Sequence, residues 1–172
     1  MASIAPMLGK RGRAKPLGAD TFERILALGA ALLLVALVAA VLRGSSEWAT
    51  VPLSVWGHLA TIAVALALTP VILLGARGTR VHRGLGRVWA GAMLLTAVVS
   101  FDIRLINHGG WSWIHILSAW TLVQAPLIVW SARTHRVALH RSSVRGMVTG
   151  ALLIAGFFTF PFDRMLGHWL LG

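Results

Sequence analysis

The stretch PLSVWGHLATIAVALALTPVILLGA, Pro52–Ala76, decides the class of fold. His58 is its only ionisable residue, and the run is long enough to cross the roughly 30 Å hydrocarbon core of a bilayer as a helix. We therefore predict an all-α integral membrane protein with five transmembrane helices. The other four predicted spans are Ile25–Leu42, Val88–Leu105, Trp111–Ala132 and Gly146–Phe162.

The composition supports this class. Of the 172 residues, 57% are apolar and only 12% are charged, whereas a soluble domain carries about 25% charged residues. The mean hydropathy of +0.77 excludes a disordered chain. The chain has no cysteine, which excludes disulfides, zinc–thiolate sites, iron–sulfur clusters and covalent c-type haem attachment.

The positive charges predict an orientation. All of the 16 Lys and Arg residues except Arg43, Arg104 and Arg164 precede the first predicted span or lie between the second and third or the fourth and fifth. The positive-inside rule then places the N-terminus in the cytoplasm and the C-terminus outside. The net charge of +11 is explained by these predicted cytoplasmic segments and does not indicate a nucleic-acid partner.

The chain contains a predicted internal repeat. A basic cytoplasmic segment (1–24) and a lone helix (25–43) precede two similar helical hairpins, over 52–106 and 109–166. Both hairpins run in the same direction, so we expect a parallel repeat that forms a four-helix bundle. The matched positions are His58 and His115, Pro70 and Pro126, His82 and His140, Arg83 and Arg141, Arg87 and Arg145, and Gly91 and Gly150. Gly84 and Gly86 are predicted to form the turn of the first hairpin.

The repeat predicts paired histidines. A two-fold axis brings His58 toward His115, and His82 toward His140, across the bundle. Facing imidazoles are the axial ligands that a six-coordinate haem iron requires, so both pairs are candidate haem b ligands, with one haem favoured over two. The pair His58 and His115 is favoured because both lie within apolar spans, whereas His82 and His140 lie beside arginines in predicted basic loops. Each imidazole could instead hydrogen-bond a neighbouring helix or interfacial water. The arginines that flank the second pair are candidate contacts for haem propionates or lipid phosphates: Arg83, Arg87, Arg141 and Arg145.

Four stretches carry a resemblance to a known family. They are HRGLGRVW (82–89), WSWIHILS (111–118), ARTHRVALHR (132–141) and AGFFTF (155–160). They resemble small alphaproteobacterial multi-pass membrane proteins of the family known as domain of unknown function two-three-zero-six. This resemblance covers about residues 52–172 and implies only a multi-pass membrane protein, with no activity. We expect the chain in the bacterial inner membrane, where the orientation given by the positive charges places the C-terminus in the periplasm. The order of the four paired histidines is also similar to that of the bis-histidine cytochromes of the b-five-six-one type.

Three functions follow as expectations. The first is a membrane-embedded b-type cytochrome-like electron-transfer protein that works with quinol or a larger membrane complex. The second is a cofactor-free accessory or scaffolding subunit of a respiratory or photosynthetic complex. The third is a metal or proton transporter using His58, His115 and Asp102. No nucleophile, catalytic dyad or phosphate loop is evident, which favours an electron-transfer or accessory subunit over a stand-alone enzyme.

Overall fold

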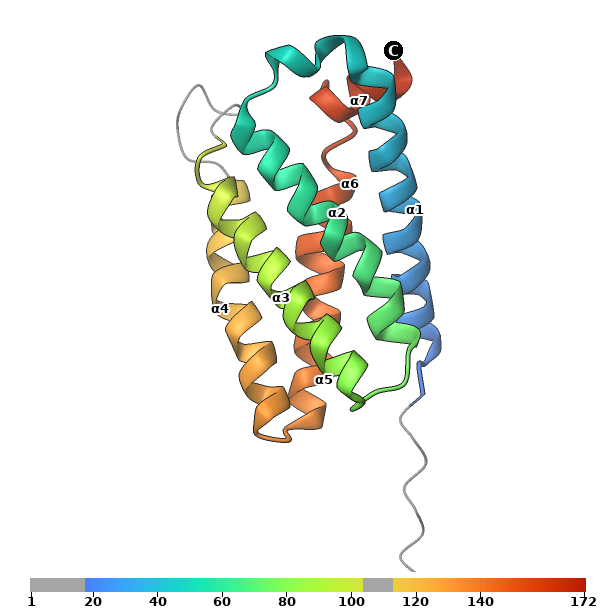
Figure 1. The fold of residues 1–172 in the computed structure, drawn as a ribbon, viewed down its shortest axis with the longest axis vertical. Helices are drawn as coiled ribbons and strands as arrows, with labels where there is room; N and C mark the ends of the chain where they lie inside the picture. The colour runs from blue at the N-terminus through green and yellow to red at the C-terminus, as the bar shows by residue number, and fades with distance from the viewer. Residues whose placement is uncertain (1–17, 104–112) are drawn as a thin grey trace, which may run out of the picture.

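The computed structural model describes residues 18–103 and 113–172. The predicted basic segment up to residue 17, Arg104, Leu105 and Trp111 lie outside these ranges. The described residues form helices and no strand (Figure 1). The elements are α1 (Thr21–Arg43), η1 (Gly44–Thr50), α2 (Leu53–Leu74), α3 (Arg80–Ser100), α4 (Trp113–Arg133), α5 (Val137–Met147), η2 (Val148–Ile154), α6 (Ala155–Phe157) and α7 (Met165–Leu171).

Three helical stretches are long and apolar enough to cross a membrane. They are Thr21–Thr50, Leu53–Leu74 and Ile114–Arg133, and they correspond to the first, second and fourth predicted spans. Their outward faces are apolar: Leu28, for example, is 61% exposed. Apolar residues all around a helix suit a lipid environment, so these helices indicate a membrane protein.

The helices that contain the third and fifth predicted spans begin before the predicted starts of these spans. α3 starts at Arg80, ahead of the predicted Val88, and the helical run of the fifth span starts at Val137, ahead of Gly146. Arg80, Arg83 and Arg87 are therefore part of α3, and Arg141 and Arg145 are part of α5. The turn predicted at Gly84 and Gly86 is wrong, because both glycines lie inside α3.

The turn of the first hairpin lies between α2 and α3. Gly78 adopts a φ of +73° there, a left-handed conformation that glycine reaches without steric cost. The side chain of Thr79 then accepts a hydrogen bond from the N–H of His82 and caps the start of α3. This cap explains why the helix begins within the basic segment.

The helices pack as a ring with α1 outside it. α2 packs on α3, α3 on α4 and α4 on α5, and η2 closes the ring by contacting α2. α3 and α5 therefore stand across the ring from each other, as do α2 and α4. α1 covers the seam where α2 meets η2. This arrangement places the predicted histidine pairs on the two diagonals of the bundle.

Three polar contacts fix the register of α2 against α3. Trp89 donates to Thr69 over 3.0 Å, Thr96 donates to Thr61 over 2.7 Å, and Ser100 lies 2.9 Å from a ring nitrogen of His58. Hydrogen bonds between helices are a common source of specificity in membrane bundles.

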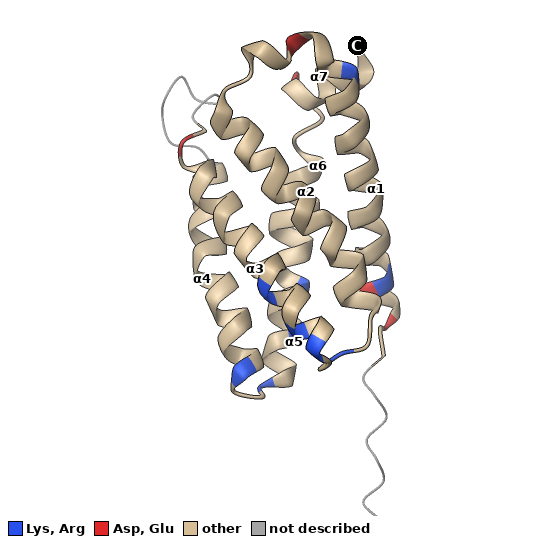
Figure 2. Ribbon diagram, viewed as in Figure 1, with Lys and Arg blue, Asp and Glu red and all other residues tan. Residues whose placement is uncertain are grey.

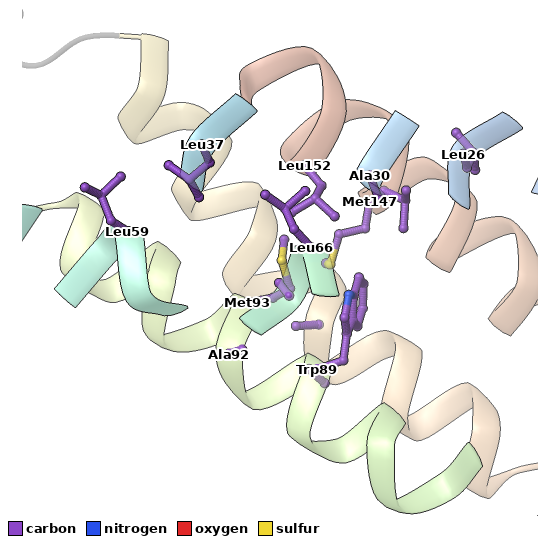
Figure 3. Close-up of a cluster of buried hydrophobic side chains, with 14 of the residues drawn as sticks. Leu26, Ala30, Leu37, Leu59, Leu66, Trp89, Ala92, Met93, Met147 and Leu152 are labelled. Atoms are coloured by element: carbon purple, nitrogen blue, oxygen red, sulfur yellow. The ribbon is translucent and has the colours of Figure 1, made fainter. Parts of the chain in front are cut away.

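The core of the bundle is apolar and well filled. Leu66 of α2, Met93 of α3, Met147 of α5 and Leu152 of η2 are all at most 1% exposed, and Figure 3 shows them converging from different helices. Trp89 joins this cluster from α3. Each side chain fills space that several helices share, so the cluster holds the ring together.

The fifth predicted span is a continuous helical run of α5, η2 and α6, with a π-helical stretch in the middle. In the predicted alignment, the second hairpin has one more residue between Arg145 and Gly150 than the first has between Arg87 and Gly91. A π turn accommodates one additional residue within a helix. The π-helical stretch thus lies where the predicted alignment requires one additional residue.

A short helix closes the end of the bundle away from the basic segments. α7, which the sequence analysis did not predict, packs against α1 and η1. Its Trp169 is 5% exposed and donates to a carboxylate oxygen of Glu47 over 3.0 Å. A Cβ at Gly44 would lie 2.1 Å from the Trp169 ring, so only glycine allows this close approach.

Candidate cofactor site

A cavity of about 790 Å³ opens at one end of the bundle, which we call the basic end. This end comprises Arg77–Arg87 and Arg133–Arg145, where Lys and Arg gather in Figure 2. The cavity lies among the ends of α2, α3, α4 and α5, beside the start of α1. Its apolar wall is formed by Ile72, Leu73, Trp89, Ile128, Val144 and Val148. Its charged and imidazole groups come from Glu23, Arg77, His82, Arg83, Arg87, Arg133, His135, His140 and Arg141.

His140 is oriented by the backbone of the neighbouring helix. Its Nδ1 lies 3.0 Å from the carbonyl oxygen of Ile128 in α4. A carbonyl oxygen can only accept, so Nδ1 carries the hydrogen and, in the neutral ring, Nε2 carries the lone pair. Imidazoles that bind metals are usually held by such a contact on the other ring nitrogen. This contact fixes the orientation of the His140 ring through Nδ1 and leaves Nε2 as the nitrogen that could bind a metal.

His82 lines the same cavity from α3. Its Nδ1 is buried and has no hydrogen-bond partner among the described residues, which costs about 1–3 kcal/mol if nothing else satisfies it. Burial lowers the pKa of His82, and the charges of His140 and Arg77 lower it further. The environment thus favours the neutral form of the His82 ring, and His82 and His140 line the same cavity. Both are properties that a pair of metal ligands needs.

The other predicted pair lies away from this cavity. His58, in α2, is half-buried, and its Nδ1 faces the Ser100 hydroxyl, which donates its hydrogen to the carbonyl of Thr96 over 2.7 Å. Ser100 must then accept from His58, so Nδ1 of His58 also carries the hydrogen. His115, in α4, is 3% exposed, and its ring centroid lies 5.8 Å from that of Phe101. The two histidines thus contact the last residue of α3 and its C-cap, and neither histidine lines the cavity.

The four predicted arginines differ in their contacts. Arg83 donates to the carbonyl of Gly78 over 2.8 Å, and Arg87 lines the cavity with an exposed side chain. Arg141 and Arg145 instead form salt bridges with two acidic residues at the start of α1, Asp20 and Glu23. The last two arginines are therefore engaged within the chain.

Glu23 is the functional residue that sequence reasoning missed. Its side chain is 2% exposed, lines the cavity and binds Arg77, Arg141 and Arg145. Asp20 caps α1 by accepting from the N–H of Glu23. The pKa of Asp20 is lowered by this hydrogen bond and by Arg145. The network joins α1 to both hairpins.

A signal for this network was present in the sequence. Asp20 and Glu23 have the spacing of a capping box, and both contacts of that motif form. The chain has only five acidic residues, and these two are next to its most basic segments. Their partners could not be read from the sequence, because they follow from the packing of α1 on η2.

The residues around the cavity fit a haem. Two imidazoles, one from α3 and one from α5, line this cavity together with apolar side chains and arginines, which are the groups that a bis-histidine haem site uses. Among residues 18–103 and 113–172, no cluster of three or more His, Asp or Glu could hold a metal ion. An iron already held by a porphyrin needs only two further ligands. Comparison of the chain with family models, curated proteins and solved structures yields no significant match.

Proposed function

We propose that this protein is a membrane-embedded b-type cytochrome-like electron-transfer protein that binds haem b in the cavity at the basic end. His82 and His140 are its proposed axial ligands. The observation that carries the proposal is the cavity of about 790 Å³ that both imidazoles line. Cofactor sites in helix bundles are commonly built in this way, from side chains on facing helices.

The chain itself supplies ligation, orientation and an apolar environment. The carbonyl of Ile128 holds His140 through Nδ1, so that Nε2 faces away from this contact and is available to a ligand. Trp89 and Val144 exclude water from the wall of the cavity, which favours the neutral form of His82. Haem bound there would supply reversible one-electron chemistry, and its potential would depend on these axial and environmental contacts.

His58 and His115 are proposed as a second, less supported haem site. The supporting observation is the hydrogen bond of Ser100, which leaves Nε2 of His58 with the lone pair. Position in the sequence favoured His58 and His115 as haem ligands. We now prefer His82 and His140, because the cavity is lined by this pair. Quinol or a larger membrane complex remains the proposed redox partner.

The proposal includes five membrane crossings. α3 and the run from α5 to α6 complete the bundle beside the three apolar helices. With the basic end in the cytoplasm of a bacterial inner membrane, the α7 end lies in the periplasm. The proposed haem of His82 and His140 is then on the cytoplasmic side.

Visible spectroscopy tests the function. Protein purified from cells supplied with haem should show a Soret band, and dithionite reduction should produce an α band. His82→Ala and His140→Ala should each abolish the low-spin spectrum. His135→Ala is the matched control, because His135 lines the same cavity from an exposed turn but is not a proposed ligand.

Each other outcome has a definite meaning. Colourless protein that takes up no added haem would refute the cytochrome function, and co-purification of that protein with a larger complex would favour the accessory subunit. Stoichiometric zinc or copper in colourless protein would favour the transporter. A haem spectrum that is lost in His58→Ala and His115→Ala, but kept in both His82 and His140 variants, would move the haem to the second pair.

A further inference from the structure

The side chains of two arginines at the cavity have no partner among the residues that the structure describes. Arg87 of α3 and Arg133 of α4 both line the cavity. In residues 18–103 and 113–172 neither makes a hydrogen bond, a salt bridge or a ring contact. Their guanidinium groups are therefore available to a ligand.

The remaining arginines of the cavity are already engaged. Arg77 and Arg141 bind Glu23, and Arg83 binds a backbone carbonyl. Among the described residues that line the cavity, Glu23 is the only acidic one, and its carboxylate is bound by Arg77 and Arg141. Within the described part of the cavity, Arg87 and Arg133 are thus the arginines whose positive charges are not paired with a carboxylate or bound to a carbonyl.

We infer that Arg87 and Arg133 form an anion site for two carboxylates of an amphipathic ligand whose apolar body occupies the cavity. The inference rests on the proposed function in expecting a porphyrin there, and it adds that the ligand is a dianion. Guanidinium groups bind carboxylates through charge-assisted hydrogen bonds. The apolar wall, which includes Ile128 and Val148, fits the body of such a ligand but offers nothing to its charged groups.

The position of the two arginines supports this reading. They come from neighbouring helices, so one ligand can contact both. Arg133 also ends α4, where the helix dipole favours a cation, and this helps to keep the guanidinium at the basic end. A neutral ligand such as a quinone would leave both charges unpaired.

The test separates the anion site from iron ligation by using porphyrin without metal. Protoporphyrin IX carries two carboxylates, whereas its dimethyl ester is neutral and has the same ring. Binding of each to the full chain in phosphatidylcholine nanodiscs is measured by quenching of tryptophan fluorescence, since Trp89 lines the cavity. The ratio of the two dissociation constants is compared between variants, so that partition into lipid cancels.

Wild-type protein should bind the diacid about tenfold more tightly than the ester, and Arg87→Gln/Arg133→Gln should bring the ratio close to one. Arg80→Gln/Arg136→Gln is the matched control and should keep the wild-type ratio. It removes the same charge from the same end, but neither residue lines the cavity, and Arg136 lies over the Trp130 ring.

A ratio near one in wild-type protein, an unchanged ratio in the Arg87/Arg133 variant, or no binding of either porphyrin would overturn the inference. These results are distinct from failure of the proposed function, because metal-free porphyrin does not need His82 or His140. Discrimination between diacid and ester without a low-spin haem spectrum would support the anion site and refute the cytochrome function. A low-spin haem spectrum without discrimination between diacid and ester would support the cytochrome function and refute the anion site.

Discussion

Replacement of Glu23 by glutamine should destabilise the bundle strongly for a change of so few atoms. The Glu23 carboxylate accepts hydrogen bonds from Arg77, Arg141 and Arg145 and from the N–H of Asp20. Glutamine has nearly the same shape, but it is neutral and has one acceptor oxygen. The variant therefore removes the charge and most of the acceptors while the side chain stays in place.

The size of the effect follows from the burial of the partners. Loss of one member of a buried ion pair costs about 3–5 kcal/mol. The Glu23 side chain is 2% exposed, whereas those of its three arginine partners are 20–26% exposed. Because the arginines can recover some hydration, we expect a smaller loss in the free energy of unfolding, of about 2–3 kcal/mol.

Reversible unfolding in mixed micelles with increasing dodecyl sulfate measures this loss. Asp163→Asn is the matched control, since Asp163 is exposed and forms no salt bridge within the described residues. It should unfold like the wild type. If Glu23→Gln also unfolds like the wild type, the network does not hold α1 to the two hairpins and our reasoning about it is wrong.

Three further variants or conditions test other parts of the structure. Gly44→Ala should cost about 2 kcal/mol in thermal unfolding, because the added methyl would displace the Trp169 ring; an unchanged midpoint would contradict this close packing. Trp89→Phe should lower the free energy of unfolding by about 2 kcal/mol, since it removes buried volume and the hydrogen bond to Thr69. In the wild-type protein, the fluorescence of Trp89 should be insensitive to bulk quenchers, because the side chain is buried. Because the pKa of His82 is lowered in the folded protein, the unfolded chain binds more protons below about pH 6.5, so stability should fall as the pH drops below that value. His82→Asn should weaken this pH dependence, and an identical dependence in that variant would assign it to another group.

The helical and apolar character of the chain was predictable from local pattern. Runs such as Pro52–Ala76 exclude charge over the thickness of a membrane, and α2 follows that run closely. The boundaries of α3 were not predictable in this way, because hydropathy marks where a helix becomes apolar and not where it begins. Thr79 sets that point through a cap within the basic segment.

The candidate site was predicted in part. All four paired histidines lie on the helices expected for them, and the ring order places each pair on a diagonal. The repeat itself stays a prediction. Sequence position favoured His58 and His115 as ligands because they lie within apolar spans, and nothing in the sequence indicated a cavity at His82 and His140.

The sequence by itself determined that this chain forms apolar helices, that most of its Lys and Arg residues cluster in a few segments, and that histidines recur at similar spacing along it. These properties depend on residue type and spacing along the chain. Only the tertiary structure decided that Glu23 binds three arginines and that Arg87 and Arg133 keep their charges unpaired at the cavity. The physical reason is that ion pairs and cavities arise between helices far apart in the sequence, and depend on which faces pack together.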